Sequence, residues 1–288
     1  MLKGIFQNKS NFKKLSILFL IMIFGYLFFQ LFITFFPPQS ITSQKFAQAF
    51  FQISFFLLPG LFFASIDSKK MFYYLGFRSS LKRQMVLLVL CMIIFTLPLI
   101  SYLANLNKEI IFSLSDYFPN IIVDLESKEE IINSTIKNFL MMDNIFHLFV
   151  NLLLMAFLPS ICEEIIFRGI IQKKFELIYN AHIAIIITSF IFSAIHMQFI
   201  SFLPRMFLGV ILGYLFYYSK NIWMPIIAHF VNNSIAILGS YFILDSGHES
   251  INNNELNISV VFLSSVVLIM FFYLYVRISK INDEDNLS

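Results

Sequence analysis

The chain has 288 residues, of which 58% are hydrophobic and 13% are charged, and its formal net charge is +3. Soluble globular domains do not combine such hydrophobicity with so few charges, so the composition indicates a polytopic membrane protein. The charge is small and no stripe of basic and aromatic residues is present, which argues against nucleic acid as a partner.

Apolar runs near the length that crosses a bilayer, about 20 residues, follow one another along the chain. We expect eight membrane helices, the sixth of them short, at residues 15–36, 46–66, 85–103, 144–172, 183–200, 206–218, 222–244 and 258–276. No cleavage site follows the first run, so it should remain as an anchor. The predicted fold class is all-α: one membrane domain over residues 1–288, a bundle of about eight spans that encloses a polar chamber.

Basic residues are concentrated in the segments 3–14, 69–83 and 277–280, whereas the 104–143 and 245–257 segments are acidic. The positive-inside rule then predicts a multi-pass protein of the cell membrane with both termini in the cytoplasm. The 104–143 segment should form a surface helix or an external flap. A composition rich in Phe, Ile and Asn is typical of an AT-rich bacterial genome.

Small residues and cysteines within the spans indicate packing. Gly209 and Gly213 form a Gly-xxx-Gly face that lets a neighbouring helix approach closely. Cys91 and Cys162 lie in apolar spans without metal-ligand spacing, which excludes a disulfide framework. Cys162 as a nucleophile beside a histidine is a weaker alternative, because a buried cysteine is usually inert.

Three charged residues, Glu163, Glu164 and Arg168, lie within the long apolar runs. Ionisable groups in a membrane are costly and usually mark a functional site. In a helix Glu164 and Arg168 stack one turn apart as an ion pair, while Glu163 points to a different face. Glu163 is therefore the free carboxylate that a general base requires. The alternative is a structural ion pair with a protonated, hydrogen-bonded Glu163.

Two later spans each carry a polar pair at helical spacing. Phe192 and His196 share one face, and His229 and Asn233 share another. Carboxylate, imidazole and amide groups together can activate water, shuttle a proton and stabilise an oxyanion, which suits amide hydrolysis. Pro159, one turn before Glu163, predicts a kink that could admit water.

A second polar pair lies at the outer end of the fourth span. His147 and Asn151 also share a face, but no charged partner is evident for them in the sequence. We expect these two residues to be structural.

The set Glu163-Glu164-x-x-x-Arg168, Phe192-x-x-x-His196 and His229-x-x-x-Asn233 resembles the CPBP (Abi) family of CAAX-processing and bacteriocin-processing intramembrane endopeptidases. The resemblance covers about residues 155–240, and the core is expected within 144–244. It implies an eight-helix fold with an internal chamber. It also implies the following roles: Glu163 and His196 activate water, His229 and Asn233 bind the oxyanion, and Glu164, Arg168 and Phe192 support the site.

The resemblance implies an intramembrane endopeptidase that hydrolyses a peptide bond of a membrane-associated or lipid-anchored substrate, from the cytoplasmic side. Its partners would be membrane lipid and the peptide or protein substrate. The alternative is a non-catalytic membrane scaffold or bacteriocin-immunity protein of the same fold. A proton-coupled transporter fits less well, because no inverted repeat with matching broken helices is detectable.

Metal dependence stays open at the level of sequence. Glu163, His196 and His229 could form a His₂Glu zinc site, although the usual His-Glu-x-x-His signature is absent. Carboxylate-activated water needs no cofactor and accounts for Asn233, a poor zinc ligand. We therefore assign no metal and expect a glutamate-type hydrolase, with a divalent metal such as zinc as the alternative.

The predicted span limits conflict with convergence of these groups. At 1.5 Å per residue, they place Glu163 and His229 on the inner side of the midplane and His196 on its outer side. Either the fifth helix is displaced and tilted, or its predicted limits are wrong by several residues.

Overall fold

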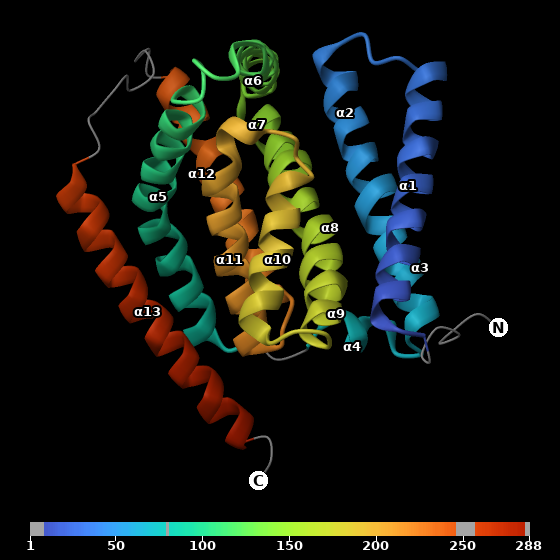
Figure 1. Ribbon diagram of the computed structural model, residues 1–288, viewed down its shortest axis with the longest axis vertical. Helices are drawn as coiled ribbons and strands as arrows, with labels where there is room; N and C mark the ends of the chain where they lie inside the picture. The colour runs from blue at the N-terminus through green and yellow to red at the C-terminus, as the bar shows by residue number, and fades with distance from the viewer. Residues whose placement is uncertain (1–8, 79–80, 246–256, 286–288) are drawn as a thin grey trace.

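The computed structural model describes residues 9–78, 81–245 and 257–285. In this part of the chain the regular structure is helical throughout and contains no strand, as the all-α prediction requires (Figure 1). The helices, including three π-helical turns (η1–η3) and one 3₁₀ turn (η4), are α1 (Asn11–Phe35), α2 (Ile41–Phe51), η1 (Gln52–Leu57), α3 (Leu58–Asp67), α4 (Met71–Leu75), α5 (Arg83–Phe112), α6 (Pro119–Phe139), α7 (Ile145–Asn151), η2 (Leu152–Phe157), α8 (Leu158–Ile166), η3 (Phe167–Gln172), α9 (Lys173–Glu176), α10 (Ala181–Ala194), η4 (Phe199–Ser201), α11 (Phe202–Ser219), α12 (Trp223–Asp245) and α13 (Ile258–Asp285).

Several of these helices are long and apolar enough to cross a membrane, so the chain is a multi-pass membrane protein. Within the described residues there are six: Asn11–Phe35, Ile41–Asp67, Arg83–Phe112, Ile145–Glu176, Phe199–Ser219 and Ile258–Ile281. The predicted spans at 183–200 and 222–244 correspond to α10 and α12, which are not among the six. The count of eight spans therefore stays a prediction.

The fifth predicted span differs most from the structure. Helix α10 has 14 residues and ends at Ala194, so it is about 21 Å long at 1.5 Å per residue. The predicted limit at residue 200 was wrong, because residues 195–201 form turns and the short η4 helix. The chain thus leaves the helical direction before His196, inside the bundle.

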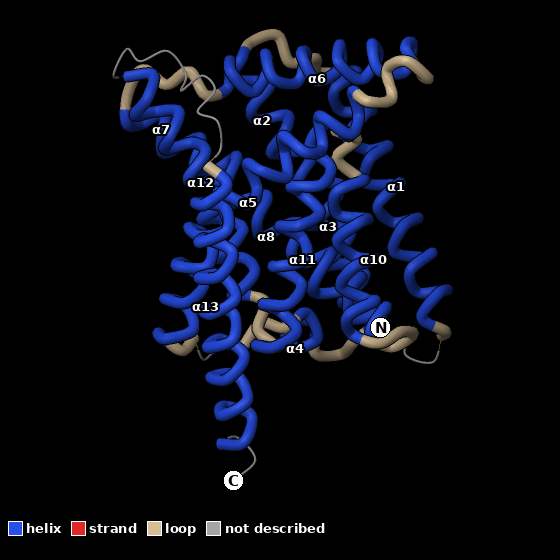
Figure 2. Tube along the Cα trace, turned by 60° about the vertical axis from the view of Figure 1, so that its left-hand side comes forward, coloured by secondary structure: helices blue, strands red, loops and turns tan. Residues whose placement is uncertain are grey.

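The helices form three groups that are visible in Figure 1. Helices α1, α2 and α3 stand on one side, α8, α10, α11 and α12 occupy the centre, and α5 with α13 closes the other side. Helix α6 lies across one end of the bundle (Figure 2). The 104–143 segment therefore consists of the end of α5 and a surface helix, which was one of its two predicted forms.

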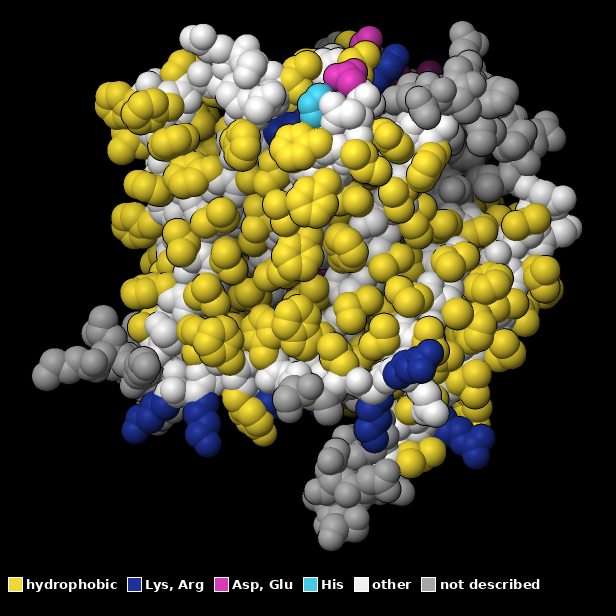
Figure 3. Space-filling view, turned by 180° about the vertical axis from the view of Figure 1, so that it is seen from behind, with side chains coloured by type: hydrophobic (Ala, Val, Ile, Leu, Met, Phe, Trp, Pro, Cys, Tyr) yellow, Lys and Arg dark blue, Asp and Glu magenta, His cyan; other side chains and the backbone are white. Residues whose placement is uncertain are grey.

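The two ends of the bundle carry different side chains. Helix α1 begins and α13 ends at the end opposite α6 (Figure 1), and Lys and Arg side chains line that same rim, whereas the wall between the ends is hydrophobic (Figure 3). Residues 1–8, 246–256 and 286–288 lie outside the described residues. The charge asymmetry agrees with the predicted cytoplasmic termini, which remain a prediction.

The Gly-xxx-Gly face of α11 packs against α10, as predicted. A Cβ atom at Gly213 would lie 2.8 Å from Cγ2 of Ile185, and one at Gly209 would lie 3.0 Å from Cβ of Ser189. Real Cβ atoms do not approach that closely, so the two helices can make this contact only because both positions are glycine.

His147 and Asn151, at the start of the fourth predicted span, have mainly structural contacts. The buried Asn151 donates from Nδ2 to the carbonyl oxygen of Phe139 at 2.8 Å, which fastens the end of α6. His147 does have a charged neighbour, Asp143 at 3.5 Å, contrary to the prediction that it lacks one. The two cysteines are free, in agreement with the absence of a disulfide framework.

Candidate active site

The acidic pair lies on α8, directly after the π-helical turn η2. Pro159 stands in the first turn of α8, and its missing N–H leaves the carbonyl of the preceding turn without its usual partner. A wide π turn, a feature that often accompanies functional sites, thus lies just before Pro159, and the kink predicted from this proline stays a prediction. Glu163 and Glu164 follow one turn later, and both are buried.

Glu164 is the member of the pair with charged partners in direct contact, all of them on one oxygen, while its Oε2 atom is buried without a hydrogen-bond partner among the described residues. Its Oε1 atom accepts from Nη1 of Arg168 at 2.8 Å and contacts Nδ1 of His229 at 2.9 Å. The side chains of Glu164 and Arg168 are both fully buried. The predicted i,i+4 ion pair is confirmed, and His229 of α12 joins it.

Arg168 connects α8 to the helices behind it. Nη2 donates to the carbonyl oxygen of Gly209 at 2.9 Å, and the guanidinium carbon lies 4.8 Å from the centroid of the Phe192 ring. That ring is also perpendicular to both imidazoles, with centroids 5.3 Å from His196 and 5.8 Å from His229. Phe192 therefore separates the two histidines and limits how far either ring can turn.

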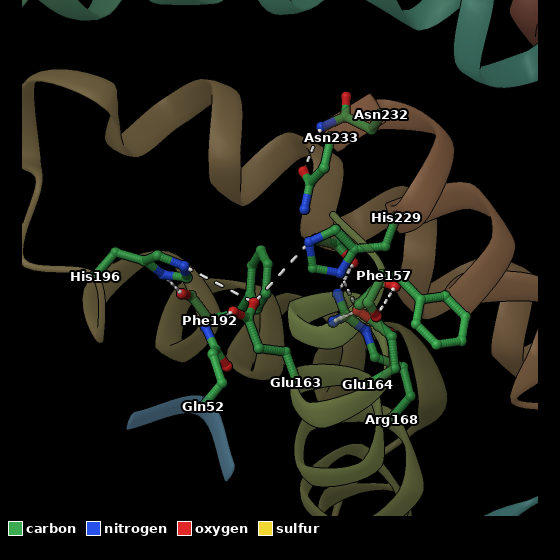
Figure 4. A network of polar contacts seen from close by, with 12 residues as sticks. Gln52, Phe157, Glu163, Glu164, Arg168, Phe192, His196, His229, Asn232 and Asn233 are labelled. Carbon is green, nitrogen blue, oxygen red and sulfur yellow. Dashed lines mark hydrogen bonds and ion pairs between the residues drawn. The ribbon is translucent and has the colours of Figure 1, made fainter. Parts of the chain in front are cut away.

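Glu163 points the other way, into a cavity. Its Oε2 atom lies 3.9 Å from Nε2 of His196 and 4.0 Å from Nε2 of His229. Figure 4 shows the carboxylate between the two imidazoles, with dashed lines to both. These separations exceed a direct hydrogen bond and are suited to a bridging water. The conflict over depth is resolved because α10 ends before His196.

The two histidines are oriented by different partners. Nδ1 of His196 lies 2.7 Å from the carbonyl oxygen of Phe192, which can only accept, so Nδ1 carries the proton. Its Nε2 atom then holds a lone pair directed toward Glu163. Nδ1 of His229 instead contacts the Glu164 carboxylate, which can only accept, so Nδ1 of this ring also carries a proton. The two imidazoles are thus held by different acceptors, and each turns Nε2 toward Glu163.

Asn233 completes the predicted set from the next turn of α12. Its Oδ1 atom accepts from Nδ2 of Asn232 at 3.3 Å. Its own amide nitrogen is therefore left on the side of His229 (Figure 4). The N–H groups of Asn233 are available to a ligand oxygen.

Gln52 is a site residue that the sequence reasoning missed. It begins the π-helical turn η1 in the first half of the chain, and its Nε2 atom donates to Oε1 of Glu163 at 3.0 Å. Fixing Oε1 in this way directs Oε2 toward the histidines. The signal for Gln52 in the sequence is an amide inside the apolar run 46–66.

The cavity at these residues has a volume of about 440 Å³. It lies in the half of the bundle nearer to α6, and its wall is largely apolar. Its lining comes from helices of both halves of the chain, and includes Gln48, Gln52, Ile100, Ile136, Leu140, Met155, Pro159, Glu163, Phe192, His196, Arg205, Leu208, His229, Asn232, Asn233 and Ile237. We call this cavity the chamber.

The chamber carries the donor types of a His₂Glu zinc site, but not the arrangement. Among the residues that the structure describes, no three His, Cys, Asp or Glu side chains are placed to hold a metal ion. Glu163 is near 4 Å from each histidine and is hydrogen-bonded to Gln52. The side chains as they stand do not fit a bound metal.

Comparisons with known proteins agree with the motif assignment. Residues 145–235 match a family model described as Rce1-like, type II CAAX prenyl endopeptidase Rce1-like. Searches of curated proteins and of solved structures found no match. The matched segment contains Glu163, His196, His229 and Asn233, but neither Gln52 nor the α6 helix.

Proposed function

Given that residues 145–235 belong to the Rce1-like family of CAAX proteases, we propose that this chain is an intramembrane endopeptidase in which Glu163 and His196 activate the attacking water. The observation that carries the proposal is the convergence of one carboxylate oxygen on two imidazole nitrogens within a largely apolar chamber. The core of this activity would lie within residues 144–244, with Gln52 contributed from outside it.

The proposed reaction starts with a water held between Oε2 of Glu163 and Nε2 of His196. As the water oxygen attacks the peptide carbonyl carbon, its proton passes to Glu163 or to the His196 lone pair. The former carbonyl oxygen becomes negative and accepts from Nδ2 of Asn233 and from Nε2 of the doubly protonated His229. Cleavage of the C–N bond then returns the proton to the leaving amine.

Glu164, Arg168 and Phe192 act on this reaction through the histidines. Glu164 stabilises the protonated His229, and Arg168 balances the charge of Glu164. The Phe192 carbonyl fixes the tautomer of His196. We propose these three as positioning residues.

We propose chemistry without a metal, because the acceptor and donor roles are filled by the side chains themselves. If this is right, activity of the purified protein survives 1,10-phenanthroline and EDTA. Loss of activity in a chelator, with recovery on adding Zn²⁺, would overturn this part of the proposal and leave a metal-dependent hydrolase.

The position of the chamber bears on the side from which a peptide reaches it. The α6 end is opposite the basic rim (Figures 1 and 3). If the termini are cytoplasmic, the chamber lies in the non-cytoplasmic half of the bundle, whereas the sequence led us to expect cleavage from the cytoplasmic side. We propose that the termini are cytoplasmic, as the distribution of basic residues predicts. The peptide would then reach the chamber from the non-cytoplasmic half of the membrane and not from the cytoplasmic side.

Cysteine labelling of intact cells tests that choice. Ser127→Cys on α6 should react with a membrane-impermeant maleimide from outside, whereas Lys70→Cys should react only after the cells are opened. Both residues are exposed, and the native Cys91 and Cys162 lie within helices. The reverse pattern would restore cleavage from the cytoplasmic side.

Peptide termini in membranes provide a test that needs no assumed substrate. Mass spectrometry compares cells that express the wild-type chain, Glu163→Ala, or the control Glu126→Ala on the exposed face of α6. A product present with the wild-type chain and the control but missing with Glu163→Ala supports the protease and identifies a membrane-associated or lipid-anchored substrate. Identical termini in all three would favour the non-catalytic scaffold or immunity protein.

A further inference from the structure

A cation lines the chamber and takes no part in the reaction proposed above. Arg205 lies in the first turn of α11, beside the wall formed by Pro204 and Leu208. Its Nη2 atom donates to Oε1 of Gln198. Its Nη1 atom is buried and, among the described residues, has no hydrogen-bond acceptor.

Arg168, the fully buried arginine of the region, also has one nitrogen, Nε, without an acceptor among the described residues, but Arg205 differs from it in its charged partners. Arg168 has a carboxylate at 2.8 Å, a backbone carbonyl at 2.9 Å and an aromatic ring beneath it. No carboxylate of the described residues lies within ion-pair distance of Arg205; Glu163 and Glu129 act on it only at longer range. The guanidinium of Arg205 is thus left with a positive charge that is not neutralised by direct contact.

Such a group calls for an acceptor. A buried charged donor without a partner is destabilising, and its attraction for an anion is strong where the surroundings are apolar. The chamber that Arg205 lines has a largely apolar wall, which includes Ile100, Ile136 and Leu208. A planar guanidinium with free N–H groups matches a carboxylate in shape and charge.

We propose that Arg205 binds a carboxylate of the peptide substrate, either the C-terminal carboxylate or an Asp or Glu side chain. The inference rests on the proposed function only for the identity of the ligand as a peptide. Because Arg205 is fixed on α11 and Glu163 on α8, a carboxylate held at Arg205 sets which peptide bond reaches Glu163. The cut should therefore fall at a constant number of residues from a carboxylate.

Peptide binding to the full-length protein in nanodiscs tests the site without turnover. The probes are acetyl-Ile-Phe-Leu as the free acid, the same peptide as the amide, and acetyl-Ile-Asp-Leu amide. Dissociation constants come from the shift of the thermal unfolding midpoint with peptide concentration. The proteins are the wild-type chain, Arg205→Gln, Arg205→Lys and the control Arg277→Gln on an exposed position of α13.

The wild-type chain and the Arg277→Gln control should bind at least one carboxylate peptide about 10- to 100-fold more tightly than the neutral amide, the range expected for a charged hydrogen bond. Tighter binding of the free acid identifies a C-terminal carboxylate, and tighter binding of the Asp peptide identifies a side chain. Arg205→Gln should bind all three alike, at the affinity of the neutral amide. Arg205→Lys should retain part of the preference.

Equal binding of all three peptides by the wild-type chain, or an unchanged preference in Arg205→Gln, would overturn the proposal. If Arg205→Gln does not fold, the test uses the ratio of the affinities for the carboxylate and amide peptides in the wild-type chain and in Arg205→Lys. Equal ratios in these two proteins reject the proposal. A chain that prefers carboxylates but cleaves nothing keeps this site and loses the proposed function. A chain that cleaves without preference keeps the function and loses the site.

Discussion

Asp67 and Glu163 are both buried carboxylates, at the end of α3 and on α8. The oxygens of Asp67 each meet an ammonium group, Oδ1 with Lys14 at 2.8 Å and Oδ2 with Lys174. Glu163 has one oxygen on the neutral amide of Gln52, while the other faces two imidazoles across gaps near 4 Å.

Burial alone therefore does not distinguish chemistry from structure in this molecule. The Asp67 cluster ties α1 and α9 to the end of α3, because one carboxylate contacts two ammonium groups directly. The Glu163 cluster leaves one carboxylate oxygen, one imidazole lone pair and one amide facing a cavity. Incomplete saturation, combined with access to a cavity, marks the reactive region.

The largest expected effect is a loss of activity on substitution of Glu163, which distinguishes the Glu163 cluster from the Asp67 cluster. Glu163→Gln keeps the size of the side chain and removes the base, so kcat/KM for the identified substrate should fall by about 10²–10⁴-fold. The unfolding midpoint should stay close to the wild-type value, because no ion pair is broken in direct contact. Retained activity with lowered stability would mean that Glu163 is a structural residue like Asp67.

Substitution of Asp67 should have the opposite effect: it should lower stability and leave activity unchanged. Asp67→Asn leaves two buried ammonium groups without their counterion and should lower the free energy of unfolding by about 3–5 kcal/mol. Urea unfolding in detergent measures it, with Asp124→Asn as the control. Asp124 forms an exposed ion pair with Lys128 on α6, and its loss should cost less than about 1 kcal/mol. Equal losses of unfolding free energy in the two variants would contradict a stabilising role for the ion pairs of Asp67.

Substitution of Gln52 tests whether Glu163 needs the hydrogen bond that Gln52 donates to its Oε1 atom. Gln52→Leu removes the donor to Oε1 and frees the carboxylate to rotate, so kcat should fall about 10-fold, the equivalent of one hydrogen bond to a charged group. KM should change little, since Gln52 orients the base and not the peptide. Gln44→Leu, on an exposed position of α2, is the matched control. A rise in KM with unchanged kcat would make Gln52 a binding residue.

The smallest effects concern the helix contact behind the site. Gly213→Ala places a Cβ 2.8 Å from Ile185 and should lower the free energy of unfolding by about 1–3 kcal/mol. Gly239→Ala, where nothing lies within 4 Å of the added Cβ, should instead stabilise the protein by about 0.5–1 kcal/mol. Unfolding curves of the two variants give the sign of each change in the free energy of unfolding. Changes of the same sign would contradict close packing of α10 on α11.

The sequence predicted those features that depend on helical periodicity. The all-helical fold, the pairing of Glu164 with Arg168 and the separate face of Glu163 follow from a period of 3.6 residues within one segment. The Gly209 and Gly213 contact was predicted for the same reason. The matching of residues 145–235 to a protease family agrees with the order of the three motifs.

Features that depend on neighbours or on helix ends were not predictable in this way. Periodicity does not indicate that Gln52 lies against Glu163, since 111 residues separate them. Hydropathy continued the fifth span past Ala194, because Ile195, Met197, Phe199 and Ile200 extend the apolar run. Arg205 falls between the predicted spans 183–200 and 206–218, although it lies in the first turn of α11 and lines the chamber.

The π-helical turns constrain the lengths of these segments. Gln52 opens η1, η2 ends just before the helix that carries Glu163, and Arg168 lies within η3. Each wide turn holds one residue more than an α turn needs, so deleting one residue there can close it to an α turn and keep the orientation of the flanking helix. A deletion within the α-helical stretch Leu158–Ile166 has no such extra residue and would rotate one flanking segment by about 100° relative to the other. Around this chamber, single-residue deletions should therefore be tolerated better within the π-helical turns than between them.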